Sequence, residues 1–304
     1  MPCYHPLTAW IARRDSFHPS GKPRYVFNHD KGLPHTEVKL KCGQCAGCRL
    51  DRSVQWATRC MYEASLHSEN CFLTLTYNDE NLPSDGSLQR DAVPLFMKRL
   101  RKALHPKKVK VFYAGEYGDP SKSFRPHYHL CLFNHFFSDS DLYSCKSAKI
   151  SGRLESYRLY TSKKLAALWP FGFSTLGDLT FESAAYVARY CMKKITGQYA
   201  DEYYQGKLPP FAHMSRRPGL AYDWFQKYKD DLYNHDQCVV RPNLITKPAK
   251  YFDAMFELID PDRMAEIKLD RKNAALNNPD NTHERLEVRE KIKKLKLQQL
   301  TRNL

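Results

Sequence analysis

The sequence predicts an α+β fold, with an antiparallel central sheet and flanking helices of the split-βαβ or ferredoxin-like type. Apolar, β-branched and aromatic runs alternate with amphipathic stretches in the order β-α-β-β-α-β. Two of these runs, 109–118 and 125–134, are separated by the turn-forming segment DPSKSF and are expected to form a hairpin. With 42% apolar residues among 304, the chain can bury a full core.

The first half of the chain supplies three predicted elements before the hairpin. Residues 48–68 are expected to be helical because apolar side chains recur at three-to-four spacing, at Leu50, Val54, Ala57, Met61 and Ala64. The β-branched and aromatic run CFLTLTY (71–77) predicts a strand, which a loop rich in turn formers follows. A second amphipathic helix over 90–104 leads into the two strands of the hairpin.

The second half of the chain is predicted to contain one irregular segment, followed by a helix, a strand and a second helix. Residues 135–156 are polar, and we expect them to be irregular. A helix over 162–169 begins at a serine N-cap, and PFGFSTLGDL (170–179) predicts a strand. A helix over 180–197 ends at its terminal glycine.

Charge indicates the class of partner. The chain has 48 Lys and Arg against 33 Asp and Glu, a net charge of +15, which favours nucleic acid or an anionic membrane as partner. No apolar run approaches the roughly 20 residues of a spanning helix, and the first residues lack a secretory pattern. We therefore expect a soluble cytosolic protein with no membrane partner, whose 10 cysteines are reduced thiols or metal ligands.

The segment RPHYHLCLF contains two histidines that predict a metal site. His127 and His129 project to the same side of a strand, because side chains alternate with a period of two. A hairpin brings Glu116 close to His127, although the sequence leaves the register open, and Asp119 is the reserve ligand. Two imidazoles and a carboxylate could bind Mg²⁺ or Mn²⁺ weakly, and Zn²⁺ or Fe²⁺ more tightly. Alone the pair is a weak signal, since twelve histidines sometimes fall two apart by chance.

The helix over 180–197 carries two tyrosines away from its apolar stripe. That stripe consists of small aliphatic residues, at Ala184, Val187, Ala188, Cys191 and Ile195. Tyr186 and Tyr190 lie on the opposite side with Lys193 and Lys194. Two tyrosines one turn apart usually form a packed pair in a core. Here both share a helix face with two lysines, which favours a role in phosphate chemistry.

Three cysteines predict a structural metal site. Cys42, Cys45 and Cys48 follow the spacing C-x₂-C-x₂-C, which suits Zn²⁺ with a fourth ligand from Cys3, His5 or Cys60. Three reduced thiols in a turn, or an iron–sulfur cluster, are the alternatives. Bound zinc would join the N-terminal segment to the helix over 48–68.

Basic stretches predict contacts with nucleic acid. The densest are 97–110, with Lys107 and Lys108, and 213–219, with Arg216 and Arg217. Interleaved aromatic residues favour a groove for a single strand, in which cations meet phosphates and rings stack on bases. Runs of charge are more often solvated faces.

The C-terminal stretch predicts a charged amphipathic helix. Val288, Ile292 and Leu295 form one apolar stripe in HERLEVREKIKKLKLQQLTRNL. We expect an exposed tail for a partner or for DNA, and a plain solvated helix fits equally well.

Several motifs, taken in their order, resemble one family. FLTLTY, the histidine strand and YVARYCMKK are similar to the HUH family of rolling-circle replication initiators, and in particular to the replication-associated proteins of gokushovirus-type microviruses. MPCYHPL, CGQCAGCR, FYAGEYG, LWPFGF and MSRRPG agree with this, so the resemblance runs from residue 1 to about 225. It implies a Cys-rich N-terminal segment (1–48) packed on the core, an HUH endonuclease domain (49–235) and a largely helical C-terminal extension (236–304).

The resemblance also implies an activity, that of a metal-dependent, site-specific DNA endonuclease that also transfers strands. His127, His129 and Glu116 would hold Mg²⁺ or Mn²⁺, and a tyrosine would attack the scissile phosphate, assisted by a lysine. A 5′-phosphotyrosine link and a free 3′-OH primer result, and the second tyrosine allows the displaced strand to be closed into a circle.

The implied partners are single-stranded and origin DNA, with a host polymerase and helicase in the host bacterial cytoplasm. The absence of a GxxxxGK[ST] motif agrees with a reaction that needs no ATP. The oligomeric state stays open. A non-catalytic single-stranded DNA-binding protein is the main alternative, and a His₂-carboxylate iron oxygenase explains neither the charge nor the tyrosines.

Overall fold

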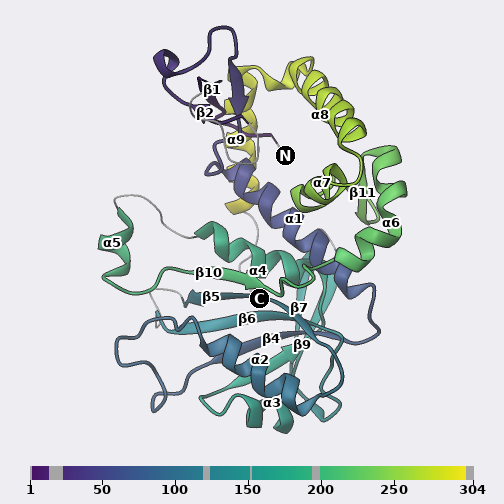
Figure 1. The fold of residues 1–304 in the computed structure, drawn as a ribbon. Coiled ribbons are helices and arrows are strands. Elements are labelled where there is room, and N and C mark those ends of the chain that lie inside the picture. Colours follow the sequence, from purple (N-terminus) through teal and green to yellow (C-terminus); the bar gives the residue numbers. More distant parts are fainter. Residues whose placement is uncertain (1, 14–22, 119–123, 151–152, 194–198, 299–304) are drawn as a thin grey trace. The chain divides into compact units, whose positions relative to one another are not determined.

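A computed structural model describes residues 2–13, 23–118, 124–150, 153–193 and 199–298 (Figure 1). The chain forms two compact units. The larger unit is Ser53–Pro261, and the smaller combines Met1–Arg52 with Asp262–Leu304. Helix α1 (Ala46–Ala64) contributes residues to both.

A seven-stranded sheet forms the centre of the larger unit. All its neighbouring strands pair antiparallel. Their order is β10 (Phe211–Met214), β5 (Lys110–Tyr117), β6 (Pro126–Phe133), β4 (Asn70–Thr76), β9 (Ser174–Gly177), β8 (Arg153–Ser162) and β7 (Ser140–Ile150). The predicted α+β class, with an antiparallel sheet flanked by helices, is confirmed.

Helices cover both faces of this sheet. Figure 1 shows α2 (Ala92–Ala103) and α3 (Lys163–Leu168) on one side of the strands and α4 (Phe181–Lys193) on the other. Because side chains alternate along each strand, β6 sends Tyr128 and Leu130 into the core beneath α2 and α3, and Cys131 and Phe133 into the core beneath α1 and α4. The predicted N-cap of α3 is confirmed, since the Ser162 hydroxyl accepts a hydrogen bond from the Leu165 amide.

Two parts of the sheet differ from the prediction. Residues 135–156 were expected to be irregular, but β7 and β8 form a long edge hairpin there. The segment SDLYSCKSAKI in β7 is mostly polar, so it lacks the alternation of apolar residues that marks a half-buried strand. The short edge strand β10 was also missed, because its four residues carry little pattern and two of them, His213 and Met214, belong to the basic stretch 213–219.

The remaining elements of the larger unit follow the sheet in sequence. They are α5 (Tyr199–Tyr204), α6 (Tyr222–His235), the hairpin of β11 (Cys238–Arg241) with β12 (Leu244–Thr246), and α7 (Lys250–Glu257). Aromatic packing joins α1, α6 and α7: the Tyr62 and Trp224 rings stack with centroids 3.6 Å apart, and Phe225 stacks on Phe252. These contacts pack α6 and α7 against α1, the helix that also covers one face of the sheet.

The smaller unit has its own sheet and two C-terminal helices. Strands β2 (Tyr25–Val26), β1 (Leu7–Ile11) and β3 (Val38–Leu40) pair in that order, with a 3-10 turn at His29–Lys31. Helices α8 (Pro261–Leu276) and α9 (His283–Gln298) are separated by a second 3-10 turn, at Pro279–Asn281.

Helix α9 packs through a face that the sequence pattern did not indicate. Its predicted apolar stripe is exposed, with 47% of Val288, 47% of Ile292 and 52% of Leu295 accessible. Leu286 and Glu290, one turn apart, are buried instead. The helix is therefore neither a free tail nor a fully solvated helix: it packs against the N-terminal segment.

Candidate metal-binding active site

The histidines and the carboxylate come together through the register of the β5–β6 hairpin. Glu116 of β5 lies directly opposite His127 of β6, which settles the register that the sequence left open. On its other edge β6 pairs with β4, where Thr74 lies opposite His129. The strand that carries both histidines is thus held between two ladders.

Three side chains converge on one point of this strand. Glu116 Oε1 lies 2.9 Å from His127 Nε2 and 3.1 Å from His129 Nε2. One ligand atom from each residue lies within 4.8 Å of the others. Glu116 and His129 are buried, whereas His127 is partly accessible. The arrangement is a buried set of two imidazole nitrogens and one carboxylate, open at the His127 side.

Neighbouring groups orient both imidazole rings. The His127 Nδ1 lies 3.0 Å from the Arg125 carbonyl oxygen, to which it donates, and the His129 Nδ1 lies 3.1 Å from the Thr74 hydroxyl. Such outer hydrogen bonds fix the ring orientation of metal-binding histidines and direct the other nitrogen at the ion. Both Nε2 atoms accordingly face Glu116. Thr74 was missed by the sequence analysis, and only the strand register could have identified it.

The carboxylate of Glu116 is adapted to remain ionised. Burial raises its pKa, but hydrogen bonds with His127 and His129 outweigh this, and the pKa lies below its ordinary value. An ionised carboxylate with two imidazole nitrogens is a donor set that a divalent cation can use. The residues present therefore fit a metal ion.

Tyr186 lies at the edge of this cluster. Its ring meets the His129 ring edge-on, with centroids 5.2 Å apart. The guanidinium of Arg189, which the sequence analysis did not single out, lies 5.9 Å from the centre of the Tyr186 ring. Ala184, Val187 and Ala188 are buried, so the predicted apolar stripe of α4 is confirmed at these positions. Tyr186 is partly buried at the margin of that core, beside the histidine strand.

The other predicted residues of this site are less fully described. Tyr190 and Lys193 belong to α4, and only their helical backbone is described. Lys194, Asp119 and Gly197 lie outside the described residues.

Four cysteines form a second cluster, in the smaller unit. Cys3, Cys42, Cys45 and Cys48 bring their sulfur atoms within 4.8 Å of one another. Neither other candidate for the fourth ligand takes part: His5 pairs with Glu290, and Cys60 is buried in the core beneath α4.

Backbone amides point at the sulfur atoms of this cluster. Tyr4 N lies 3.3 Å and Cys48 N 3.5 Å from Cys45 Sγ. Despite burial, these hydrogen bonds lower the pKa of the Cys45 thiol to about 6. Burial raises the pKa of Cys3 and of Cys48. The cluster is therefore built to stabilise negative charge on at least one sulfur.

The predicted DNA-binding residues lie on the surface of the larger unit. Arg216 and Arg217 are exposed in a tight turn after β10, where Arg216 pairs with Gly219. Lys107 forms an ion pair with Glu69, and Lys108 is exposed just before β5.

Buried charged groups of α1 hold the chain just after the arginine turn. The Arg59 guanidinium donates to the Leu220 carbonyl oxygen at 3.1 Å, and the Ala221 amide donates to the Glu63 carboxylate at 2.7 Å. Arg59 and Glu63 are 5% and 0% exposed. The turn that presents Arg216 and Arg217 is thereby anchored from inside the unit.

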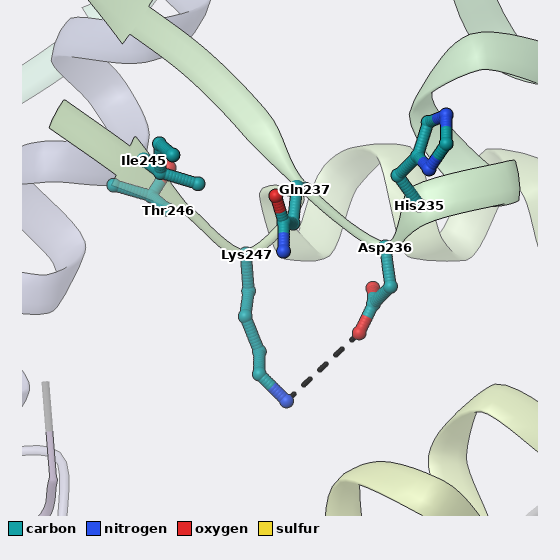
Figure 2. Close-up of a pocket in the computed structure, with 6 residues that line it drawn as sticks. All are labelled: His235, Asp236, Gln237, Ile245, Thr246 and Lys247. Carbon is teal, nitrogen blue, oxygen red and sulfur yellow. Dashed lines mark ion pairs between the residues drawn. The ribbon is translucent and has the colours of Figure 1, made fainter. Parts of the chain in front are cut away.

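A separate surface pocket lies beside the β11–β12 hairpin. Figure 2 shows its lining residues, which are His235, Asp236, Gln237, Ile245, Thr246 and Lys247, with an ion pair between Lys247 and Asp236. The pocket shares no residue with either cluster.

Within the described part of the chain, no helix is long and apolar enough to cross a membrane.

Comparisons with known proteins place the histidine cluster inside a recognised region. The family model described as replication-associated protein ORF2/G2P matches residues 70–195. This range includes Glu116, both histidines and Tyr186, and it excludes the four cysteines.

Three viral proteins are similar to this chain. Replication-associated protein ORF2 of Spiroplasma virus 4 is 35% identical over 72% of this chain and 68% of that protein. Replication-associated protein VP4 of Bdellovibrio phage phiMH2K is 33% identical over 77% of this chain and 74% of that protein. Replication-associated protein ORF4 of Chlamydia phage 1 is 35% identical over 51% and 38%, respectively. No solved structure matches.

Proposed function

Because the chain belongs to the family of microvirus replication-associated proteins, we propose that it initiates viral DNA replication by cutting one strand at the origin. The observation that supports the proposal is the edge-on contact between the Tyr186 and His129 rings, at the margin of a group of three side chains that could hold a metal ion.

His127, His129 and Glu116 would hold Mg²⁺ or Mn²⁺. When bound, such an ion would polarise the scissile phosphate and stabilise the charge that develops on it. The protein's own contribution is to keep the ligand set in place, through the two ladders of β6 and the hydrogen bonds from His127 to Arg125 and between His129 and Thr74.

Tyr186 would act as the nucleophile in the first transfer. Its phenol loses a proton, its oxygen forms a bond to phosphorus, and the bond from phosphorus to the 3′ oxygen breaks. The 3′ oxygen takes up a proton and becomes the free 3′-OH, while the 5′ phosphate stays on the tyrosine. A phenol has an ordinary pKa of about 10, so a nearby cation must favour the phenolate. Arg189 and Lys193 belong to α4, and Lys194 follows it in the sequence, so these cations would supply the positive charge.

Tyr190 would serve the second transfer, one helical turn further on. It would cut the regenerated origin, and the released 3′-OH would attack the first phosphotyrosine to close a circle. The number of phosphodiester bonds is conserved, so no ATP is required. The 3′-OH left by the first cut would prime a host polymerase, with a host helicase, in the host bacterial cytoplasm.

Exposed cations of the larger unit would contact the DNA. Arg216 and Arg217 stand on an anchored turn, and Lys107 and Lys108 precede β5. Such residues bind phosphates of a single strand or of origin DNA and contribute most of the affinity. For the cysteine group we propose Zn²⁺ in a structural role, because an all-thiolate set of four favours it.

Covalent capture tests the proposal. The protein is incubated with Mn²⁺ and single-stranded oligonucleotides that tile the cognate genome, and adducts that resist SDS are separated on a gel. We expect an adduct with the origin segment, lost or strongly reduced in Tyr186→Phe and absent in Tyr186→Phe with Tyr190→Phe. Tyr203→Phe, which makes the same change at an exposed position outside the site, should behave as wild type.

Two outcomes would overturn the assignment. An adduct undiminished in the double variant would place the nucleophile elsewhere. Tight binding without an adduct for any segment would favour the second candidate function, a non-catalytic single-stranded DNA-binding protein, which the net charge of +15 also supports.

A further inference from the structure

The cysteine cluster has the dimensions of a zinc site. Cys3 Sγ and Cys45 Sγ lie 3.9 Å apart, far beyond the S–S bond length of about 2.05 Å. Four sulfurs placed tetrahedrally at about 2.3 Å from Zn²⁺ are separated by about 3.8 Å. The observed separation therefore suits ligands that share one ion.

The backbone around the cluster supports thiolates. The amides of Cys42 and Cys45 lie 3.3 Å from Cys3 Sγ and Cys42 Sγ, in addition to the two that point at Cys45. Four thiolates around one Zn²⁺ leave a net charge of −2, and donated hydrogen bonds stabilise it. Gly43, with φ +75°, adopts the left-handed conformation that this compact turn requires.

Helix α9 forms part of the shell around these sulfurs. Leu286 is 6% exposed and packs with Tyr4, Cys45 and Cys48. One turn later, Glu290 accepts from His5 Nε2 at 2.8 Å. Figure 1 shows α9, in yellow, and the N-terminal strands, which belong to the same unit; the contact itself is made by His5, which precedes β1.

Three consecutive residues connect the metal ligands to the helix. Cys3 belongs to the cluster, Tyr4 packs on Leu286, and His5 pairs with Glu290. These residues precede strand β1, which starts at Leu7, so no strand pairing holds them. They are held instead by the packing of Tyr4 and by the bond that Cys3 would make to an ion in the cluster.

The other contacts of α9 are partly open to solvent. In the pair of His5 with Glu290, the His5 side chain is 60% exposed and that of Glu290 10%. The apolar stripe of Val288, Ile292 and Leu295 is half-exposed, and Arg289 hydrogen-bonds to Asp280 and Asn281 in the preceding turn. We infer that zinc bound by Cys3, Cys42, Cys45 and Cys48 clamps helix α9 onto the N-terminal segment, so that metal binding joins the two ends of the chain. This inference rests on the zinc proposed above and is independent of DNA cleavage.

Metal analysis and hydrogen exchange on the full chain test the clamp together. We expect close to one equivalent of zinc in protein purified without added chelator. Removal with a mercurial reagent and EDTA should speed amide exchange at least tenfold in peptides from 2–11 and 283–298. Peptides from β4 to β6 should not change, and added Zn²⁺ should restore protection.

Variants separate the metal from the helix contact. Cys3→Ser should lose zinc and the protection of α9, whereas Cys145→Ser, an exposed thiol outside the cluster, should keep both. Leu286→Ala should keep zinc and lose protection only in 283–298. If Cys3→Ser does not fold, the chelated wild type gives the same comparison.

The outcomes distinguish the two claims. Protein without bound metal would overturn both the zinc and the clamp. Bound zinc whose removal leaves exchange in 283–298 unchanged would overturn the clamp alone. Neither result bears on covalent capture by Tyr186, which is measured separately.

Discussion

The two potential metal-binding groups of this chain are built in opposite ways. His127, His129 and Glu116 project from paired strands inside a seven-stranded sheet, so the two ladders bring them to contact distance. The cysteines come from an irregular segment, a turn and the first residues of a helix, outside the paired strands. We therefore expect the first group to keep its arrangement without a metal and the second to depend on a metal for its shape.

The donor sets differ in the same sense. The histidine group offers three potential ligands of mixed type and has a tyrosine at its edge, so a metal ion held there would keep coordination positions for substrate. The cysteine group offers four ligands of one type with amides pointing at them. A site with free coordination positions suits catalysis, and a site with four protein ligands suits a structural role. Removing a metal from the histidine group should therefore lower activity more than stability, and removing one from the cysteine group should lower stability more than activity.

Loss of the histidines is the largest effect that this comparison predicts. His127→Ala with His129→Ala should lower the rate of adduct formation by at least about 10²-fold, the loss typical when a stabiliser of transition-state charge is removed. DNA affinity and zinc content should stay within about twofold, since phosphate contacts dominate affinity. Rates are measured by single-turnover gels, affinity by fluorescence anisotropy. His283→Ala, at an exposed position in α9, is the control. A double variant that still cuts DNA would contradict the assignment of catalysis to the histidine group.

Loss of a cysteine should produce the reverse pattern. Cys42→Ser should lower the stability of the smaller unit by several kcal/mol, because the binding energy of a structural zinc, about 10–16 kcal/mol in small domains, is folding energy. Exchange of peptides from β5 and β6 should not change. Urea unfolding followed by hydrogen exchange measures both. Equal destabilisation of β5 and β6 would show that the two groups are not independent.

An outer-sphere substitution sharpens the comparison at the histidine group. Thr74→Val removes the hydroxyl next to His129 Nδ1 and keeps the side-chain shape. We expect the Mn²⁺ concentration for half-maximal cleavage to rise about 10–100-fold, with maximal rate less affected. Thr76→Val, on the same strand and bonded to the Phe173 carbonyl, is the matched control. An unchanged metal requirement would mean that the ladder by itself orients the ring.

The smallest effect concerns the arginine turn. Arg216→Ala with Arg217→Ala should weaken single-stranded DNA binding and lower the slope of log affinity against log salt by about 0.7 per lost phosphate contact. Cleavage at saturating DNA should persist, since neither residue belongs to a metal group. An unchanged slope in anisotropy titrations would remove this turn from the DNA surface. Lys227→Ala, an exposed cation on α6, serves as control.

Local patterns predicted most of the sheet and its helices. The buried strands and α1, α2 and α4 have the apolar periodicity that their packing requires, and the same-face placement of His127 and His129 follows from strand geometry. The hairpin register was not predictable, because the segment between Glu116 and His127 allows several alignments. For the same reason Thr74 could not be assigned to His129 before the pairing was known.

The cysteine group and α9 were predictable only in part. Spacing indicated three ligands, but Cys3 joins them through a turn of the chain about 40 residues earlier, which spacing does not report. For α9 the apolar stripe was expected to be exposed, and it is about half-exposed, while the helix also packs through Leu286 and Glu290. Glu290 is an acidic residue that pairs with His5 and carries no apolar signal, so the sequence pattern did not indicate this contact.

Strand β6 is hydrogen-bonded along both edges, which limits what the proposed reaction cycle can move. A strand with two neighbours cannot slide by one residue without breaking both ladders and turning its histidines to the opposite face. In the proposed cycle, Tyr186 and Tyr190, one helical turn apart in α4, would act in succession on one phosphate position. In that cycle the sheet would stay in place, and α4 together with the DNA would supply the displacement between the first cut and the closing of the circle.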